Sequence, residues 1–179
     1  MSSFSLKRIT DSVIRFGEIH NKKVIPGEGP SNAKLVMVGE AGGREEEKLG
    51  RPFVGRAGRF LNKSLSEVGI DRNKIYITNV VKMRWQGRPP PSAIEEWLPL
   101  LKEELEAVKP RIVVLLGDVA VKAVLDKSYT IGNNHGQLIR KDGQGFLVMP
   151  HPSAAMRFNR MRLMFKSDMD GLRQLLGEK

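Results

Sequence analysis

The sequence predicts an α/β fold, a three-layer α/β/α sandwich around a mostly parallel central sheet of about four strands. Short apolar runs rich in branched residues alternate along the chain with longer segments of helical periodicity, as in βα units. The run 111–116 contains five consecutive apolar residues. A strand so uniformly apolar has no face for solvent, so we place it centrally among parallel strands joined by right-handed crossovers.

Apolar side chains that recur with a 3.6-residue period mark the helices. These helices are expected over 5–16, over 55–69, from Ser92 onward, over 119–125 and, with a break, after the last strand. Gly69 is well placed to end the second, and Ser92 to cap the third after a stiff basic loop with three consecutive prolines. Pro99 falls inside the third helix and is expected to kink or divide it. Residues 17–30 and 129–136 are expected to be loops.

Short segments with the length and branched content of strands lie at 34–38, 74–81, 111–116, 135–140 and 145–149. The last two flank a turn at 141–144. After the first strand, Gly39, Gly42 and Gly43 are expected to force a turn, which leaves Glu40 at the C-terminal tip of that strand. In an open α/β sheet this edge is where ligands bind, because helices cover both faces of the sheet.

Length and composition indicate one domain spanning residues 1–179, because 40% hydrophobic content in 179 residues is enough for a substantial core. No stretch approaches the ~18 consecutive apolar residues of a membrane span, and the N-terminus lacks the basic and apolar regions of a signal peptide. We therefore expect a soluble cytoplasmic protein that does not contact a membrane.

The charge balance favours a polyanionic partner. Lys and Arg number 30 against 20 Asp and Glu, which gives a formal net charge of +10. A basic soluble protein without a nucleic-acid role is the alternative. The chain contains no cysteine, which excludes a disulfide, a thiolate nucleophile and a cysteine-held metal cluster.

Three polar side chains follow or end different predicted strands. Glu40 comes after the first strand, Asn79 lies near the end of 74–81, and His151 follows the last strand. Since parallel strands end at one rim, we expect a carboxylate, an amide and an imidazole to converge there, which suits hydrolysis or base recognition. Each has a simpler interpretation, as a cap, a strand-end amide or a turn residue, and Phe53 would by default belong to the core.

Four segments in order resemble one known family: GEAGGREE, RPFVGRAG, YITNVVK and MPHPSAAMR. They are similar to motifs of the uracil-DNA glycosylase superfamily, most of all to its family four, the iron–sulfur branch of bacteria and archaea. The similarity extends from about Gly27 to Arg157. It implies a DNA partner, a prokaryotic source, base excision repair, and a monofunctional enzyme that releases uracil and leaves an abasic site.

The resemblance also implies a role for each motif residue. Glu40 is the acidic residue of the first motif, where it orients water and counters charge on the sugar, Phe53 stacks on the flipped base, Asn79 reads the base, and His151 stabilises the leaving uracil. Further expected contacts are Gly39, Gly43 and Glu46 with the base, and Arg56, Ser153, Met156 and Arg157 with DNA. Met156 and Arg157 stand where the family places a side chain that wedges into the duplex.

The sequence departs from family four at its cofactor. The family holds an iron–sulfur cluster with four cysteines, of which the third position matches Met83 and the fourth Trp97 here. We therefore expect no cluster, no other metal and no cofactor, with apolar packing in its place. Gly42 stands where the first motif usually has proline.

The expected function is thus uracil excision by a monomer on single- or double-stranded DNA. Two alternatives remain open. One is a relative within the superfamily that excises another deaminated base, hypoxanthine or xanthine. The other is a nucleic-acid-binding protein of the same fold with weak catalysis.

Overall fold

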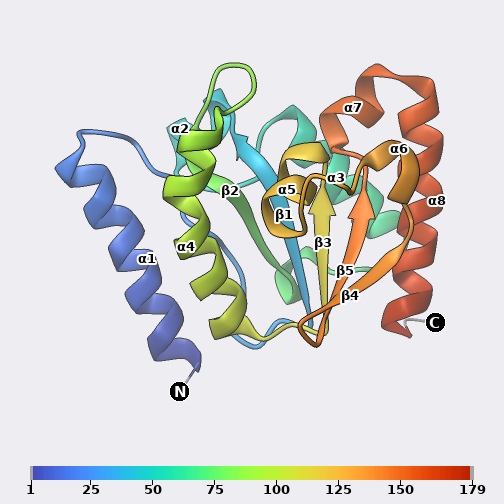
Figure 1. Cartoon of the computed structure of the whole chain (residues 1–179), viewed down its shortest axis with the longest axis horizontal. Helices are drawn as coiled ribbons and strands as arrows, with labels where there is room; N and C mark the ends of the chain where they lie inside the picture. The colour runs from blue at the N-terminus through green and yellow to red at the C-terminus, as the bar shows by residue number, and fades with distance from the viewer. Residues whose placement is uncertain (1, 178–179) are drawn as a thin grey trace.

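A five-stranded sheet lies between two layers of helices in the structure, a computed structural model that describes residues 2–177 (Figure 1). The strands are β1 Leu35–Gly42, β2 Tyr76–Arg84, β3 Ile112–Leu116, β4 Leu138–Lys141 and β5 Gln144–Met149. The helices are α1 Ser2–Ile19, α2 Arg44–Leu49, α3 Arg56–Glu67, α4 Pro91–Val108, α5 Asp118–Val124, α6 Ile131–Asn134, α7 Pro152–Arg157 and α8 Asn159–Leu176, with a 3-10 turn at Arg72–Lys74.

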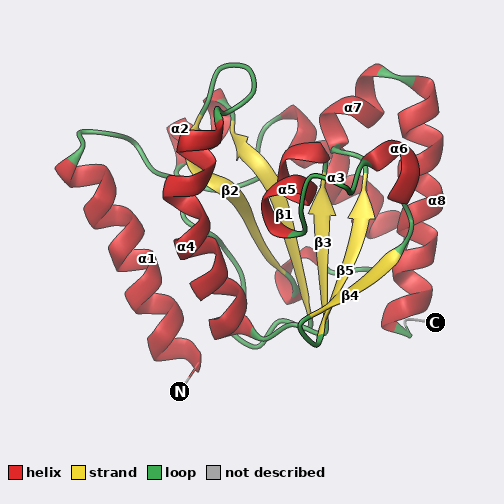
Figure 2. Ribbon diagram, in the orientation of Figure 1, coloured by secondary structure: helices red, strands yellow, loops and turns green. Residues whose placement is uncertain are grey.

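The strand order is β2-β1-β3-β5-β4. Pairing is parallel between β1 and β2, β1 and β3, and β3 and β5, while β4 pairs antiparallel with β5 at the edge. The predicted three-layer, mostly parallel α/β fold is confirmed, and β3 is central, as its uniform apolar run indicated (Figure 2). The C-terminal ends of the parallel strands therefore share one edge of the sheet.

Each face of the sheet has its own hydrophobic core. On one face, α1, α4 and α5 cover a cluster that includes Val13, Trp97 and Val121. On the other, α3, α7 and α8 cover a cluster that includes Leu65 and Phe165. Successive side chains of a strand point to opposite faces, so each strand contributes alternate residues to both cores. No helix within residues 2–177 has the length and apolar character needed to cross a membrane.

The first strand runs further than its glycines indicated. β1 continues through Gly39 to Gly42, so the turn falls at Gly43 and Glu40 lies inside the strand rather than at its tip. The parallel ladder explains this difference, because β2 pairs with β1 as far as Gly42 and a glycine in such a ladder costs only part of the pairing energy. At Gly42 an added Cβ would clash with the side chain of Ile25, so the residue is closely packed.

Several expected boundaries also change. α4 runs through Pro99 without a break and begins at Pro91 after Pro90, so Ser92 lies in the first turn and is not the cap. Tertiary burial of Trp97 and Leu101 outweighs the hydrogen bond that Pro99 removes. Short elements that periodicity does not detect are α2, the 3-10 turn before β2 and α6; α6 lies within the expected 129–136 loop and shortens the following strand to Leu138–Lys141.

Candidate base-binding site

A cavity of about 330 Å³ opens at the C-terminal edge of β1 and β2. The predicted site residues that line it are Phe53, Asn79, His151, Gly43, Glu46 and Arg56. Larger cavities of about 570 and 740 Å³ lie elsewhere, the former around Lys34 and Arg111 at the opposite ends of β1 and β3. Those cavities do not bring together an aromatic ring, an amide and an imidazole, so the smaller one is the better candidate for a functional site.

Asn79 presents a buried amide to this cavity. Its side chain is 2% exposed, and its Oδ1 atom has no hydrogen-bond partner among the described residues. Nearly all buried polar atoms in folded proteins are paired, because an unpaired one costs about 1–3 kcal/mol. An orphaned amide oxygen on a cavity wall is therefore a place where a ligand donor fits.

Gly39 allows the aromatic ring to approach this amide. Gly39 pairs with Asn79 in the β1–β2 ladder, and a Cβ added to it would lie 2.5 Å from both Asn79 Oδ1 and Phe53 Cζ. Any larger residue at this position would displace one of the two groups. The glycine does not line the cavity itself, and its contribution is the close approach of ring and amide.

Phe53 adopts an unusual backbone conformation, with φ of +52°. Such a conformation is rare outside glycine and needs support from its surroundings. Glu46 supplies one support, since its carboxylate accepts hydrogen bonds from the backbone N–H groups of Val54 at 3.0 Å, Gly55 at 2.6 Å and Gly43 at 3.1 Å. Gly58 supplies another, because a Cβ there would clash with the Phe53 carbonyl. Glu46 thus shapes the cavity by holding its loop.

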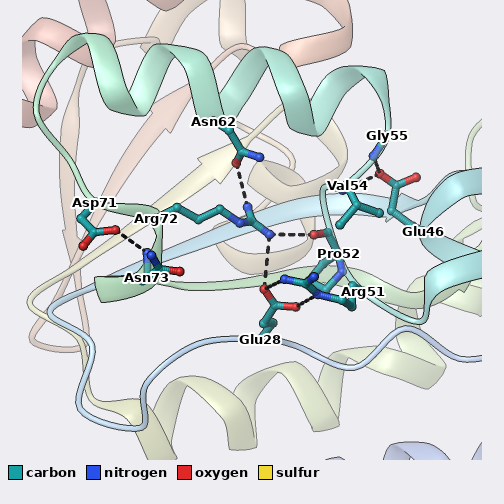
Figure 3. Close-up of polar contacts among 10 residues, drawn as sticks. All are labelled: Glu28, Glu46, Arg51, Pro52, Val54, Gly55, Asn62, Asp71, Arg72 and Asn73. Carbon is teal, nitrogen blue, oxygen red and sulfur yellow. Dashed lines mark hydrogen bonds and ion pairs between the residues drawn. The ribbon is translucent and has the colours of Figure 1, made fainter.

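A second set of polar contacts holds the same loop from the other side (Figure 3). Arg72 donates to the carbonyl of Pro52 at 2.9 Å and to Asn62 Oδ1 at 3.0 Å, and it lies 3.7 Å from Glu28. Glu28 also accepts two hydrogen bonds from Arg51, at 2.6 and 2.9 Å. The arginine that anchors Pro52 is thus part of a charge network reaching from the 3-10 turn to the segment before β1.

His151 is held in one tautomer. It caps α7, where its Nδ1 accepts from the backbone N–H of Ser153 at 3.2 Å and lies 2.8 Å from Ser153 Oγ. Burial lowers the pKa of His151 to about 4, so the ring is neutral near pH 7. Because Nδ1 is an acceptor, the single proton of the neutral ring sits on Nε2. The centroid of the His151 ring lies 6.0 Å from that of Phe53. Since Ser153 occupies Nδ1, the Nε2–H group is the donor that remains available.

Glu40 is not among the residues that line the cavity. It follows Gly39 in β1, and alternation along the strand directs its side chain to the other face of the sheet. Burial raises the pKa of the Glu40 carboxyl, and the nearby Arg88 guanidinium partly opposes this effect. Within residues 2–177 the Glu40 carboxylate has no hydrogen-bond partner, whereas Glu46 has three donors. Of the two acidic residues, Glu40 keeps the uncommitted carboxylate.

A second cavity of about 330 Å³ adjoins the first and shares Arg56 and Ala57 with it. The remaining lining residues are Ser153, Met156 and Arg157. The four residues predicted to contact DNA therefore lie together around a cavity that adjoins the first one. Arg162 steadies this corner, since it donates to the carbonyls of Ala155 and Met156, each at 3.2 Å.

The residues at the cluster positions of family four do not fit an iron–sulfur cluster. Trp97 is 1% exposed and packs edge-on against Phe16, with ring centroids 4.5 Å apart, while Met83 packs against the same core. The chain supplies no cysteine, and the described residues contain no group of three or more His, Asp or Glu side chains that could hold a metal.

Sequence reasoning missed several residues that build the site. Gly117, with φ of +89°, lets His151 approach, since a Cβ there would lie 3.0 Å from the His151 Cβ. Arg72, Glu28 and Arg88 act on the loop or on Glu40 across long sequence separations. Only Gly117, directly after the apolar run of β3, carried a local signal, because a glycine at a strand end often marks a close approach.

The fold and the cavity define the class of protein, an α/β protein with an aromatic ring, a free amide oxygen and an imidazole around one cavity at the carboxyl edge of its sheet, next to arginine side chains. Comparison with known proteins identifies the family. Residues 26–173 match the model of the uracil DNA glycosylase superfamily, and the chain belongs to that superfamily. Its members act on DNA, and this membership makes the chain a hydrolase of N-glycosidic bonds.

Individual relatives agree with this assignment. The chain is 33% identical to a type-4 uracil-DNA glycosylase of Archaeoglobus fulgidus, over 90% of this chain and 87% of the relative. It is 34% identical to the type-4 uracil-DNA glycosylase of Pyrobaculum aerophilum, over 84% and 82% of the two chains. It is 37% identical to the type-4 uracil-DNA glycosylase of Thermotoga maritima, over 85% of this chain and 82% of the relative. The similarity to family four inferred from the motifs is thereby confirmed.

Proposed function

We propose that the protein is a monofunctional DNA glycosylase that hydrolyses the N-glycosidic bond of uracil in DNA, in base excision repair of deaminated cytosine. The observation that carries this proposal is the buried, unpartnered Oδ1 of Asn79 beside the ring of Phe53. A base must leave the duplex before this bond can be reached, at a cost of a few kcal/mol. Stacking on Phe53 offsets about 1–3 kcal/mol of it.

The Asn79 amide suits the edge of uracil. Its Oδ1 accepts from uracil N3–H while its Nδ2 donates to O4, whereas cytosine presents the reverse pattern and would leave buried groups unpaired. The six-membered ring of hypoxanthine carries the same order of donor and acceptor as uracil. Excision of hypoxanthine or xanthine is therefore the second candidate function. The size of the cavity must discriminate between uracil and these larger purines.

Bond cleavage places negative charge on the departing uracil and positive charge on the sugar. We propose that His151 donates from Nε2 to uracil O2, where the anion forms. Although Glu40 does not line the base cavity, we propose that its uncommitted carboxylate, at the same end of the sheet, orients water and counters the charge on the sugar, which lies outside that cavity. Among the described residues that line the cavity none is a lysine, which supports hydrolysis without a Schiff base and release of an abasic site.

We propose that the rim formed by Arg56, Ser153, Met156 and Arg157 contacts DNA. Arg56 and Arg157 suit phosphate, and Met156 is apolar and unbranched, as a wedge between base steps requires. The chain is proposed to act as a single domain and a monomer in the cytoplasm, and without a cofactor. The packing of Trp97 and Met83 at the family's cluster positions supports the last point.

One assay tests the function. Purified protein is incubated with single- and double-stranded oligonucleotides carrying uracil, hypoxanthine or xanthine, and abasic sites are then cleaved with alkali. We expect strand scission at uracil that depends on the alkali step. Release of a purine alone would support the second candidate, and binding without scission would leave only a nucleic-acid-binding role. Scission without alkali would contradict a monofunctional enzyme.

A further inference from the structure

A buried ion pair lies directly behind Asn79. Lys82 in β2 and Glu104 in α4 form a salt bridge with side chains that are 0% and 2% exposed. Lys82 Nζ also donates to Thr78 Oγ1 at 2.6 Å and to the backbone carbonyl of Asn79 at 2.9 Å. Glu104 in turn accepts from Thr78 at 2.9 Å and from Tyr76 at 3.1 Å.

Such a pair is a poor means of stabilising a fold. Removing two charges from water costs more than their attraction usually returns, and apolar residues of similar volume are commonly as stable or more so. The surrounding core is apolar and well packed, with Trp97 and Leu101 of the same helix buried nearby. The chemistry proposed above uses neither Lys82 nor Glu104. Neither fold stability nor the proposed chemistry therefore explains a buried ion pair at this position.

The geometry of β2 supplies that role. Thr78 and Lys82 face α4, whereas the Asn79 side chain faces the cavity on the other side of the sheet. β2 is an edge strand, and Ile77 directs both its N–H and its C=O outward, to Glu28. Backbone groups two residues apart point the same way, so the Asn79 carbonyl also faces outward. Lys82 supplies the hydrogen bond that a further strand would otherwise make.

We propose that Lys82 is a positioning residue that fixes Asn79 for base reading, with Glu104, Tyr76 and Thr78 anchoring the ammonium group. This inference rests on the proposed function. On its outer side β2 bonds the segment before β1 on either side of Asn79, through Ile77 with Glu28 and through the Lys82 carbonyl with Ile25. Between these contacts the Asn79 backbone has no strand partner on that side among the described residues, so it can shift and carry the amide with it. The buried cation ties that backbone to α4, so the amide keeps its place although its own Oδ1 has no protein partner.

The test replaces the pair with neutral groups that leave no unpaired charge. In Lys82→Met/Glu104→Gln the glutamine still accepts from Thr78 or Tyr76, and methionine fills the volume of the lysine chain. We expect the single-turnover rate of uracil release to fall about tenfold or more, since misplacement by about an ångström costs up to 10²-fold. KM for DNA should change less than about twofold, because the pair does not face the DNA.

Two comparisons separate positioning from loss of stability. Leu101→Ala removes a fully buried side chain from the same helix and leaves the Asn79 carbonyl bond in place; at a temperature where circular dichroism shows both proteins folded, it should keep the wild-type rate. In an Asn79→Ala background the pair substitution should have no further effect, because Lys82 then has no amide to position. A merely structural pair would lower the rate equally in both backgrounds.

If the double variant does not fold, Thr78→Val removes one partner of Lys82 and should lower the rate several-fold with KM unchanged. A folded double variant that reacts as fast as Leu101→Ala would overturn the inference. The inference would also be overturned if the pair substitution lowered the rate of uracil release by the same factor in the wild-type and Asn79→Ala backgrounds, or if Thr78→Val left that rate unchanged. A wild-type protein that releases no uracil would overturn the proposed function, and the inference with it.

Discussion

At the scale of single residues, the site depends on hydrogen-bonding groups left free by the fold. Asn79 keeps an unpaired oxygen, and His151 keeps Nε2–H because Ser153 occupies its other nitrogen. Glu40 keeps its carboxylate, whereas Glu46 gives its own to the backbone. These differences follow from which neighbours each side chain meets, since residue type alone cannot distinguish Glu40 from Glu46.

Exchanging the amide of Asn79 for a carboxylate should disrupt base reading. Asn79→Asp removes the donor to uracil O4 and sets a second acceptor against it. We expect uracil release to slow about 100-fold, since an unpaired buried partner costs about 1–3 kcal/mol. The new carboxylate also repels the negative charge that develops on the departing uracil. Single-turnover kinetics measures the effect. Asn133→Asp, the same change at an exposed position, serves as the control, and unchanged kinetics in Asn79→Asp would reject the role.

The pH dependence of the rate should report on Glu40. The raised pKa of its carboxyl means that the ionised fraction falls as the pH drops through a value above 4.5, so activity should decline on the acidic side. His151, with a pKa of about 4, stays neutral between pH 5 and 8 and adds no slope there. Glu40→Gln should be slow and nearly independent of pH. If the activity of Glu40→Gln still declined at low pH, Glu40 would be excluded as the source of that decline.

At the scale of elements, the loop between α2 and α3 is the part of the site under most constraint. It holds Phe53 at positive φ, and its anchors are Glu46 on one side and Arg72 on the other (Figure 3). The glycines at 39 and 58 let the ring and the loop backbone approach their neighbours. The aromatic platform is thus built before any base arrives, which lowers the cost of ordering it on binding.

Removing the Glu46 carboxylate should destabilise this loop. Glu46→Ala leaves three backbone N–H groups without their charged acceptor, and we expect a loss of about 2–4 kcal/mol in the free energy of unfolding, with weaker uracil release. Glu46→Gln keeps one oxygen for Val54 and Gly55 and should lose only about 1 kcal/mol. Urea denaturation measures both. Lys48→Ala, at an exposed position of α2, should change the free energy of unfolding little. A similarly small effect of Glu46→Ala would show that the loop keeps its conformation without the Glu46 carboxylate.

At the scale of the whole molecule, two separate cores hold one sheet, and the cluster positions of family four lie in one of them. Trp97 and Met83 fill that region together with Phe16 of α1. The packing joins α1, α4 and the edge strand β2, which carries Asn79. Apolar contact thus connects the elements next to the base-reading strand.

This packing predicts how the protein responds to loss of metal. We expect purified protein to contain no stoichiometric iron, and its melting temperature and uracil release to stay unchanged after treatment with a chelator. Trp97→Ala should by contrast lower the free energy of unfolding by about 3–5 kcal/mol, because it opens a cavity in the core. Elemental analysis and thermal denaturation measure these effects. Stoichiometric iron in clean recombinant protein would contradict the expectation.

Patterns along the chain were sufficient to predict the layers of the fold and the rim of the site. Uniform apolar runs identify the buried strands and place 112–116 at the centre, and helical periodicity identifies the main helices. The motif order points to the family, and six of the predicted residues line the cavity. These features depend on neighbours along the chain or on patterns within it, which a sequence states directly.

Which polar groups are paired and which are free depends on contacts that form only when the chain folds. Gly39 continues a strand because β2 lies beside it, and Pro99 remains in a helix because Trp97 is buried. Glu46 is committed to a loop eight or nine residues away, and Lys82 meets a glutamate 22 residues away. Each outcome is a competition between local preference and a distant partner, and the partner becomes known only when the chain is folded.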